Sequence, residues 1–167
     1  MQPSRMDKAE FVAVFGDVFE HSPWIAGRVW ESGLDVFHDK AARLHRAFAQ
    51  VIHAANHEQK LSLLQAHPEL AAGIVSEKEL TTASQAEQRA AGLDQCSTGE
   101  FAEFQHLNES YRARFGFPFI MAVKESSRLE ILEAFRTRLA NTRKQELQAA
   151  VEQVMSIARF RIESKFE

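Results

Sequence analysis

The sequence predicts an all-α fold, a single-domain bundle of about seven to nine helices over residues 1–167. Residues that cap helix starts recur along the chain, with Glu or Gln three positions later. Between these caps, apolar side chains repeat at the spacing of one helix face. A Gly-rich strand–turn–helix unit is absent from the sequence. These observations together favour helices over a mixed α/β architecture.

The first two helices are predicted near the N-terminus. Asp7 and Glu10 form a capping-box pattern, followed by apolar residues on one helix face: Phe11, Val14, Phe15, Val18 and Phe19. Ser22 and Pro23 supply an N-cap and a proline at the first helical position of a short second helix. This helix carries both tryptophans and is expected to stop near Gly33.

A third helix is predicted to open at Asp39 and to present one apolar face: Leu44, Phe48, Val51, Ile52 and Ala55. A short continuation passes through Leu61 and Leu64. It must end at His67, because Pro68 disfavours the helical conformation in the residue before it. His67 is therefore expected at a helix terminus.

Four more helices follow in the second half of the chain. Their starts are Ser84 with Glu87, Ser97 with Glu100, Ser127 with Glu130, and Thr142 with Gln145. The apolar run over residues 115–123 contains Gly116 and Pro118, so it is too broken for an ordinary helix. It suits a buried strand or an ordered loop. We favour the loop, because a lone strand would leave its backbone groups unsatisfied, whereas a loop beside a pocket offers them to a ligand.

Composition and charge exclude several classes of protein. A net charge of −3 without a basic stripe argues against nucleic acid as a partner. No segment reaches the roughly 18 apolar residues of a membrane span, and no signal core or peroxisomal address is present. Cys96 is the single cysteine, which excludes an internal disulfide and suits a reducing compartment. We therefore expect a cytoplasmic protein that binds neither nucleic acid nor membrane.

Arg161 is the most informative polar residue. It lies on the core-facing stripe of the last helix, with Leu147, Ala150, Val151, Val154 and Ala158. Fraying or snorkelling of the side chain is the ordinary explanation for such an arginine. A partly buried guanidinium needs an anion or several acceptors, and no carboxylate is expected on that stripe of the same helix, so the partner must come from elsewhere or from a ligand. An anionic substrate would qualify.

Two further residues are candidates for acid–base or binding roles. His67 either caps the last carbonyls of its helix or moves protons at the edge of the core, where Leu63, Leu64 and Leu70 flank it. Glu87 either completes the capping box of Ser84 or contacts a ligand. The helix start over residues 84–88 also offers free N–H groups that suit a polar ligand.

Other candidate sites are weaker. His53 and His57 are four residues apart and would need a third metal ligand that the sequence does not show, so we predict no metal site. Cys96 is better explained as a loop or packing thiol than as a nucleophile. The Phe-rich stripes are core, because they recur at helical spacing without interleaved basic residues.

Several segments together resemble the OHCU decarboxylase family, which acts on 2-oxo-4-hydroxy-4-carboxy-5-ureidoimidazoline in urate breakdown. The matching pieces are Phe15-Gly16 with Ser22-Pro23-Trp24, His67-Pro68-Glu69-Leu70, Ser84 to Gln88 with Ala91-Gly92-Leu93, Asn108-x-x-Tyr111, and Arg114 to Ile120. The last helix adds Ala158 to Arg161 in the family's place. Glu125 stands where glycine is expected to be common in the family. That departure affects the local loop shape more than the chemistry.

The resemblance implies an all-α homodimer that uses no cofactor and no metal and converts this small anionic ureidoimidazoline to (S)-allantoin with loss of CO2. By position, His67 matches the catalytic proton donor, and Glu87 and Arg161 match two further active-site residues. The substrate-contacting positions are, again by the resemblance, Pro68, Ser84, Gln85, Ala86, Glu87, Gln88, Phe119, Ile120, Met121, Ala122 and Val123. The alternatives are a helical interaction module without catalysis and a metal-dependent hydrolase.

Overall fold

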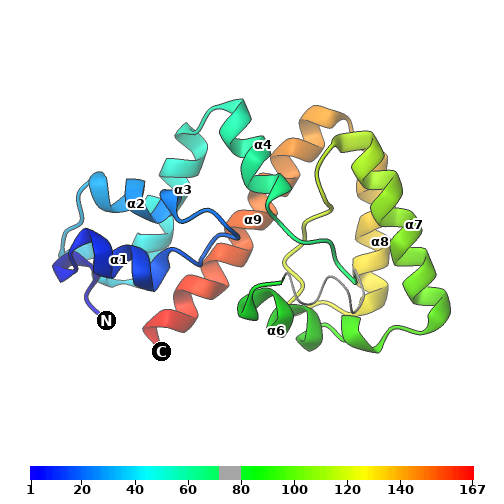
Figure 1. Ribbon diagram of the computed structural model, residues 1–167, viewed down its shortest axis with the longest axis horizontal. Helices are drawn as coiled ribbons and strands as arrows, with labels where there is room; N and C mark the ends of the chain where they lie inside the picture. Colours follow the sequence, from blue (N-terminus) through cyan, green and yellow to red (C-terminus); the bar gives the residue numbers. More distant parts are fainter. Residues whose placement is uncertain (72–79) are drawn as a thin grey trace. The chain divides into compact units, whose positions relative to one another are not determined.

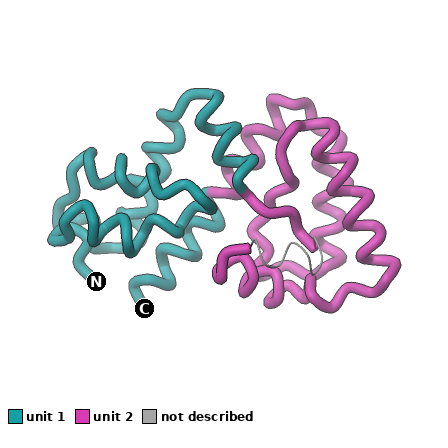
Figure 2. The backbone as a smooth tube through the Cα atoms, viewed as in Figure 1, with its two compact units in different colours: residues 1–66, 155–167 teal, residues 67–154 magenta. Residues whose placement is uncertain are grey.

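The computed structural model describes residues 1–71 and 80–167. The chain forms two compact units (Figure 2). Unit 1 consists of residues 1–66 and 155–167, and unit 2 consists of residues 67–154. Over the described ranges, all regular structure is helical, with eight α-helices and three short 3-10 segments and no strand. The prediction of an all-α fold is confirmed. The prediction of one domain over residues 1–167 stays a prediction.

Unit 1 is built around aromatic side chains from its first helices. Its helices are α1 (Lys8–Phe15), α2 (Trp24–Glu31), α3 (Ala41–Ala54), α4 (His57–Gln65) and the end of α9 (Arg143–Phe166). The 3-10 segments Pro3–Arg5 and Val36–Asp39 precede α1 and α3. In Figure 1, α1, α2 and α3 lie side by side. Phe11, Phe15, Phe19 and Phe48 are 0–2% exposed and contact one another as ring pairs, which confirms that this stripe is core.

Unit 2 contains α6 (Thr82–Ala90), the 3-10 segment Leu93–Gln95, α7 (Thr98–Phe115), α8 (Arg128–Leu139) and the first part of α9. Helices α7 and α8 run alongside each other (Figure 1). Their interface holds a second aromatic core, in which Tyr111, Phe119 and Phe135 are fully buried. The rings of Phe119 and Phe135 stack with centroids 3.9 Å apart, and Tyr111 meets both edge-on. Phe119, the first residue of the segment 119–123, is thereby packed in this core.

Most of the predicted helix starts are confirmed. Reciprocal capping boxes are present at Asp7, Ser97 and Ser127. Thr142 and Gln145 likewise exchange backbone-to-side-chain hydrogen bonds at the start of α9. Each such cap satisfies N–H groups that the first helical turn leaves without a partner. The local pattern was therefore sufficient at these four positions.

Three predicted starts are wrong. The Ser22 hydroxyl donates to the carbonyl of Glu20 and does not cap α2, whose N-cap is Pro23. The carboxylate of Asp39 accepts from Ser4, so α3 begins two residues later. In the third case the side chain of Thr81 caps α6, which places Ser84 inside the helix. For Ser22 and Asp39, another hydrogen-bond partner takes the group that the pattern assigned to a cap.

The apolar run over residues 115–123 is a loop, as predicted. Phe115 is the last residue of α7, and Gly116 ends the helix with a φ of 80°. Residues 117–123 have no regular secondary structure. Within the described residues, no helix combines the length and the apolar character required to cross a bilayer.

Replacing Gly116 with alanine is expected to lower the free energy of unfolding by roughly 1 kcal/mol, the cost of a left-handed conformation for a residue with a Cβ. An added Cβ would meet no atom within 4 Å, so backbone strain alone is tested. Gly99→Ala, on α7 with equally open surroundings and without a positive φ, is the matched control. It should be neutral or slightly stabilising in urea unfolding. Equal destabilisation of both variants would contradict the assignment.

Candidate functional site

His67 lies just beyond the end of a helix, in the first residues of unit 2. Helix α4 ends at Gln65, and Pro68 follows His67. The imidazole is 7% exposed, so it is buried at the start of an irregular segment. Ala71, four residues on, has a φ of 51°, which is uncommon for a residue with a Cβ. The prediction of a histidine at a helix terminus is confirmed. Because its side chain is buried, His67 differs from a typical surface histidine.

The backbone that follows His67 is held by side chains from two helices. Gln88 of α6 donates from Nε2 to the carbonyl of Glu69 at 3.2 Å, and its Oε1 accepts the N–H of Ala71 at 3.1 Å. Asn108 of α7 donates to the carbonyl of Leu70 at 2.9 Å. Both amide side chains are at least nine-tenths buried. The Gln88 amide, which bonds backbone through both its nitrogen and its oxygen, and the Asn108 amide nitrogen together fix the path of the chain beside the imidazole.

Helix α6 presents a polar face that contains part of the predicted site. Ser84 and Gln88 are buried, and Glu87, which shares their face at helical spacing, is half-buried. Gln85 is half-buried on the neighbouring face. The side chain of Ala86 is exposed and lies on the opposite face. The structure therefore brings Ser84, Glu87 and Gln88 together and leaves the Ala86 side chain away from them.

The predicted capping role of Glu87 and the predicted cradle of N–H groups at Ser84 are both wrong. The N–H of Ser84 donates to the hydroxyl of Thr81 at 3.3 Å. The N–H of Gln85 donates to the carbonyl of Thr81 at 3.0 Å. Thr81 and not Ser84 is the N-cap, so Glu87 lies in the second turn of α6 and has no capping function. The N–H groups of Ser84 and Gln85 are therefore not available to a ligand.

The segment 119–123 turns most of its side chains inward. Phe119, Ile120 and Val123 are 0–4% exposed, whereas Met121 and Ala122 are half-buried. The carbonyl of Ile120 accepts a hydrogen bond from Arg138 at 2.6 Å. The N–H of Ala122 donates to Oε1 of Gln153 at 2.9 Å. A ligand would therefore meet this segment through the remaining backbone groups and through Met121 and Ala122.

Arg161 is buried in unit 1, as the apolar stripe of α9 predicted. It is 6% exposed, and its Nη2 lies 3.2 Å from Oε1 of Glu20, which is 1% exposed. Its Nη1 donates to the carbonyl of Val18 at 3.3 Å. The sequence left two sources of a counter-charge open, another part of the chain or a ligand. Glu20 is a counter-charge from the chain itself.

The expectation that no carboxylate lies on the stripe of α9 that carries Arg161 is wrong. Glu146 lies on it, four residues before Ala150, and is fully buried. Its carboxylate is bound by Arg138, with Oε1 at 2.7 Å from Nε, and by the hydroxyl of Tyr111 at 2.5 Å. Burial and this hydrogen bond raise the pKa of Tyr111 above its usual range. Glu146 belongs to a network in unit 2 and is not the counter-charge of Arg161.

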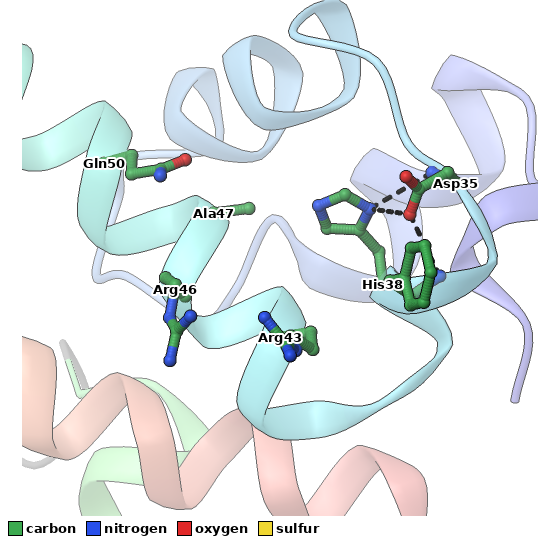
Figure 3. A pocket seen from close by; sticks show the side chains of 7 residues that line it. Asp35, His38, Arg43, Arg46, Ala47 and Gln50 are labelled. Carbon is green, nitrogen blue, oxygen red and sulfur yellow. Dashed lines mark hydrogen bonds and ion pairs between the residues drawn. The ribbon is translucent and has the colours of Figure 1, made fainter.

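Unit 1 also contains an open hollow of about 280 Å³ (Figure 3). Figure 3 shows Arg43, Arg46 and Gln50 on α3 and, on the segment before it, His38 hydrogen-bonded to Asp35, with Nδ1 and Oδ1 2.8 Å apart. Both arginines are exposed. None of the residues that line the hollow was a predicted site residue. Its open shape and mixed charges suit solvent better than a buried small ligand.

Metal and thiol chemistry find little support in the side chains. Over residues 1–71 and 80–167, no three His, Cys, Asp or Glu side chains are grouped so as to hold a metal ion. His53 and His57 are both exposed. Burial, with a smaller contribution from Glu100, raises the pKa of the Cys96 thiol. The thiol therefore stays protonated near neutral pH, as expected for a packing cysteine.

Residues 4–163 match the family model for OHCU decarboxylase. The chain belongs to the OHCU decarboxylase family. A 2-oxo-4-hydroxy-4-carboxy-5-ureidoimidazoline decarboxylase of Haloferax volcanii is 39% identical over 99% of this chain and 94% of its own. A uric acid degradation bifunctional protein of Bacillus subtilis is 38% identical over 95% of this chain, which spans 31% of that longer protein.

A solved structure agrees with the OHCU decarboxylase assignment. The crystal structure of (S)-allantoin synthase superposes with a TM-score of 0.75 at 28% identity over 98% of this chain, which spans about half (52%) of that chain. The resemblance inferred from short motifs is confirmed, and with it the prediction of a carboxy-lyase. The interaction module is disfavoured by the same finding.

The sequence missed three residues that the structure places at the site segments. Glu20 faces Arg161, Arg138 binds the carbonyl of Ile120, and Gln153 accepts the N–H of Ala122. One signal was available, since Glu20 is a charged residue directly after the buried Val18 and Phe19. Arg138 lies in the last turn of α8, where cations are common, so nothing in the neighbouring sequence marked it as a residue that supports the site.

Proposed function

We propose that this chain converts 2-oxo-4-hydroxy-4-carboxy-5-ureidoimidazoline to (S)-allantoin and CO2, with His67 as the acid–base group. The family match over residues 4–163 is the observation that carries this proposal. It includes His67, the α6 face with Glu87, the segment 119–123 and Arg161. The burial of His67, ahead of a backbone held by Gln88 and Asn108, fits a group that must approach one face of a small substrate.

The reaction sets three requirements for the protein. Loss of the carboxylate as CO2 leaves an electron pair on carbon, and this charge spreads into the neighbouring ring system. The protein must orient the departing carboxylate, stabilise the delocalised charge, and deliver a proton to one face only. The third requirement needs a proton-carrying side chain in a fixed position, since free solvent would reach both faces.

The proposed roles follow from these requirements. His67 handles the proton, and Glu87 accepts hydrogen bonds from the ureido or ring N–H groups. Arg161 follows the negative charge of the substrate. The backbone of segment 119–123 donates hydrogen bonds to the ring carbonyls. Because the N–H of Ala122 is already bound by Gln153, we assign these hydrogen bonds to the N–H groups of Met121 and Val123. Further substrate contacts are proposed for Pro68, Ser84, Gln85, Ala86, Gln88, Phe119 and Ile120.

We also propose that the chain acts as a homodimer in the cytoplasm and needs neither a metal nor an organic cofactor. The charge left by decarboxylation has a sink in the substrate's own ring, so the proposed chemistry does not require an added one. Full activity after exhaustive chelation would support this and exclude a metal-dependent hydrolase. Light scattering of the purified chain measures the oligomeric state, and a monomer at micromolar concentration would contradict the dimer.

The direct test generates the unstable substrate from urate in situ and follows optical rotation. Spontaneous decay gives the racemate, so an enzyme of the proposed specificity must both hasten allantoin formation and produce the dextrorotatory enantiomer. Heat-inactivated protein at the same concentration is the control. Formation of racemic allantoin at the uncatalysed rate would overturn the proposed function.

Glu87→Gln is expected to lower kcat/KM by about 10²-fold, because the neutral amide is a weaker acceptor for the substrate N–H groups than a carboxylate. Thr81 caps α6, so the substitution should leave the start of this helix intact. Glu109→Gln, an exposed carboxylate on α7, is the matched control. Wild-type kinetics in Glu87→Gln would remove this residue from the proposed site.

A further inference from the structure

A buried polar network in unit 2 ties three helices to the backbone of segment 119–123. Glu146 of α9 is fully buried, and its Oε1 accepts a hydrogen bond from Nε of Arg138, on α8, at 2.7 Å. The same oxygen forms an ion pair with Nη2 of that guanidinium at 2.5 Å. Asn141 donates to the other carboxylate oxygen at 2.9 Å. Tyr111 of α7 donates to Oε1 at 2.5 Å. The carboxylate thus holds the guanidinium by one edge in a fixed orientation.

The remaining side of the Arg138 guanidinium faces the segment. Nη1 donates to the carbonyl of Ile120 at 2.6 Å, and the guanidinium carbon lies 4.4 Å from the centroid of the Phe119 ring. That ring is in turn stacked on Phe135. One side chain thereby contacts both the backbone and the aromatic anchor at the start of the segment.

A second side chain binds the backbone in the other half of segment 119–123. Gln153 of α9 accepts the N–H of Ala122 at 2.9 Å. Ile120 and Ala122 alternate with Met121 and Val123, whose N–H groups are those assigned above to the substrate. The carbonyl of Ile120 shares its planar peptide group with the N–H of Met121, and the N–H of Ala122 belongs to the next peptide group, so the two contacts fix the peptide groups on both sides of Met121.

We propose that Arg138 and Gln153 are positioning residues, which hold segment 119–123 in the conformation that receives the substrate. The inference rests on the proposed function for the identity of the substrate, but its structural part concerns only this chain. A residue that fixes a binding segment contributes about equally to ground-state and transition-state binding. Its loss therefore raises KM and changes kcat little.

Arg138→Lys is the decisive variant. Lysine keeps the positive charge beside Glu146, so the buried carboxylate is not left uncompensated. A single ammonium cannot reproduce the guanidinium fork that reaches Glu146 and Ile120 together. We expect KM to rise about tenfold, the equivalent of one hydrogen bond, with kcat within about twofold of wild type. Arg136→Lys, an exposed position of α8 paired with Glu103, is the matched control and should behave as wild type.

Gln153 provides an independent pair of variants. Gln153→Met removes the acceptor of Ala122 N–H at similar side-chain volume, and Gln153→Glu restores an acceptor. We expect KM to rise several-fold in the first variant and to return toward wild type in the second. Rescue by the conservative variant separates a hydrogen bond to the segment from simple packing of the side chain.

Amide hydrogen exchange gives a readout that does not depend on catalysis. Exchange over residues 119–123 should quicken about tenfold in Arg138→Lys and Gln153→Met, and stay unchanged in Arg136→Lys. Unchanged exchange and unchanged KM in both test variants would overturn the positioning role. If wild-type protein fails to turn over the substrate while exchange quickens as expected, the proposed function falls and the hold on the segment stands.

Discussion

Replacing His67 with asparagine is expected to lower kcat/KM by about 10²–10⁴-fold, the usual contribution of a general acid–base group. Asparagine is close in size and keeps hydrogen-bonding capacity, but it cannot exchange a proton near neutral pH. The backbone beyond this position is fixed by Gln88 and Asn108, so the variant should still fold. The loss should fall mainly on kcat, in contrast to the effect expected at Arg138.

His106→Asn is the matched control, since His106 is an exposed histidine on α7 of the same unit. It should retain wild-type rates. The optical purity of the product adds a second readout, because allantoin formed without a positioned proton donor should approach the racemate. Retention of both the rate and the dextrorotatory product by His67→Asn would remove His67 from the mechanism.

The predictable part of the fold is the part encoded within a few residues. The caps at Asp7, Ser97 and Ser127 were correct because donor and acceptor lie three positions apart on the same turn. At α6 two cap residues, Thr81 and Ser84, are also three positions apart, so both patterns are locally acceptable. Both residue types favour the N-cap position, so local sequence does not decide between them.

The proposed site comes from short motifs that resemble the family, whereas the residues that support it depend on distant contacts. His67, Glu87 and Arg161 come from such motifs. Glu20 is 141 residues from Arg161, and no periodicity relates the two positions. Arg138 and Gln153 reach the segment through contacts 18 and 31 residues apart in the sequence. Supporting residues of this kind follow from tertiary packing, which a single sequence does not reveal.

Replacing Arg161 with methionine is expected to lower the free energy of unfolding by about 3–5 kcal/mol, because the buried carboxylate of Glu20 then loses the guanidinium that faces it. Replacing both residues, as Glu20→Met with Arg161→Met, removes the two charges together. The double variant should recover most of that stability, since an apolar pair of similar volume often replaces a buried ion pair without cost. Urea unfolding of the two single variants and the double variant gives the coupling energy.

The double variant should recover stability without recovering activity. A guanidinium already paired with Glu20 binds a substrate carboxylate less tightly than an uncompensated one would, which suits a reaction in which that carboxylate must leave. In the proposed mechanism, Arg161 stabilises charge as it spreads into the ring. We expect kcat/KM of the double variant to stay about 10²-fold or more below wild type, the usual loss for a donor aimed at developing charge. A stable double variant with wild-type turnover would show that Arg161 serves only the fold of unit 1, and the substrate's charge would need another partner.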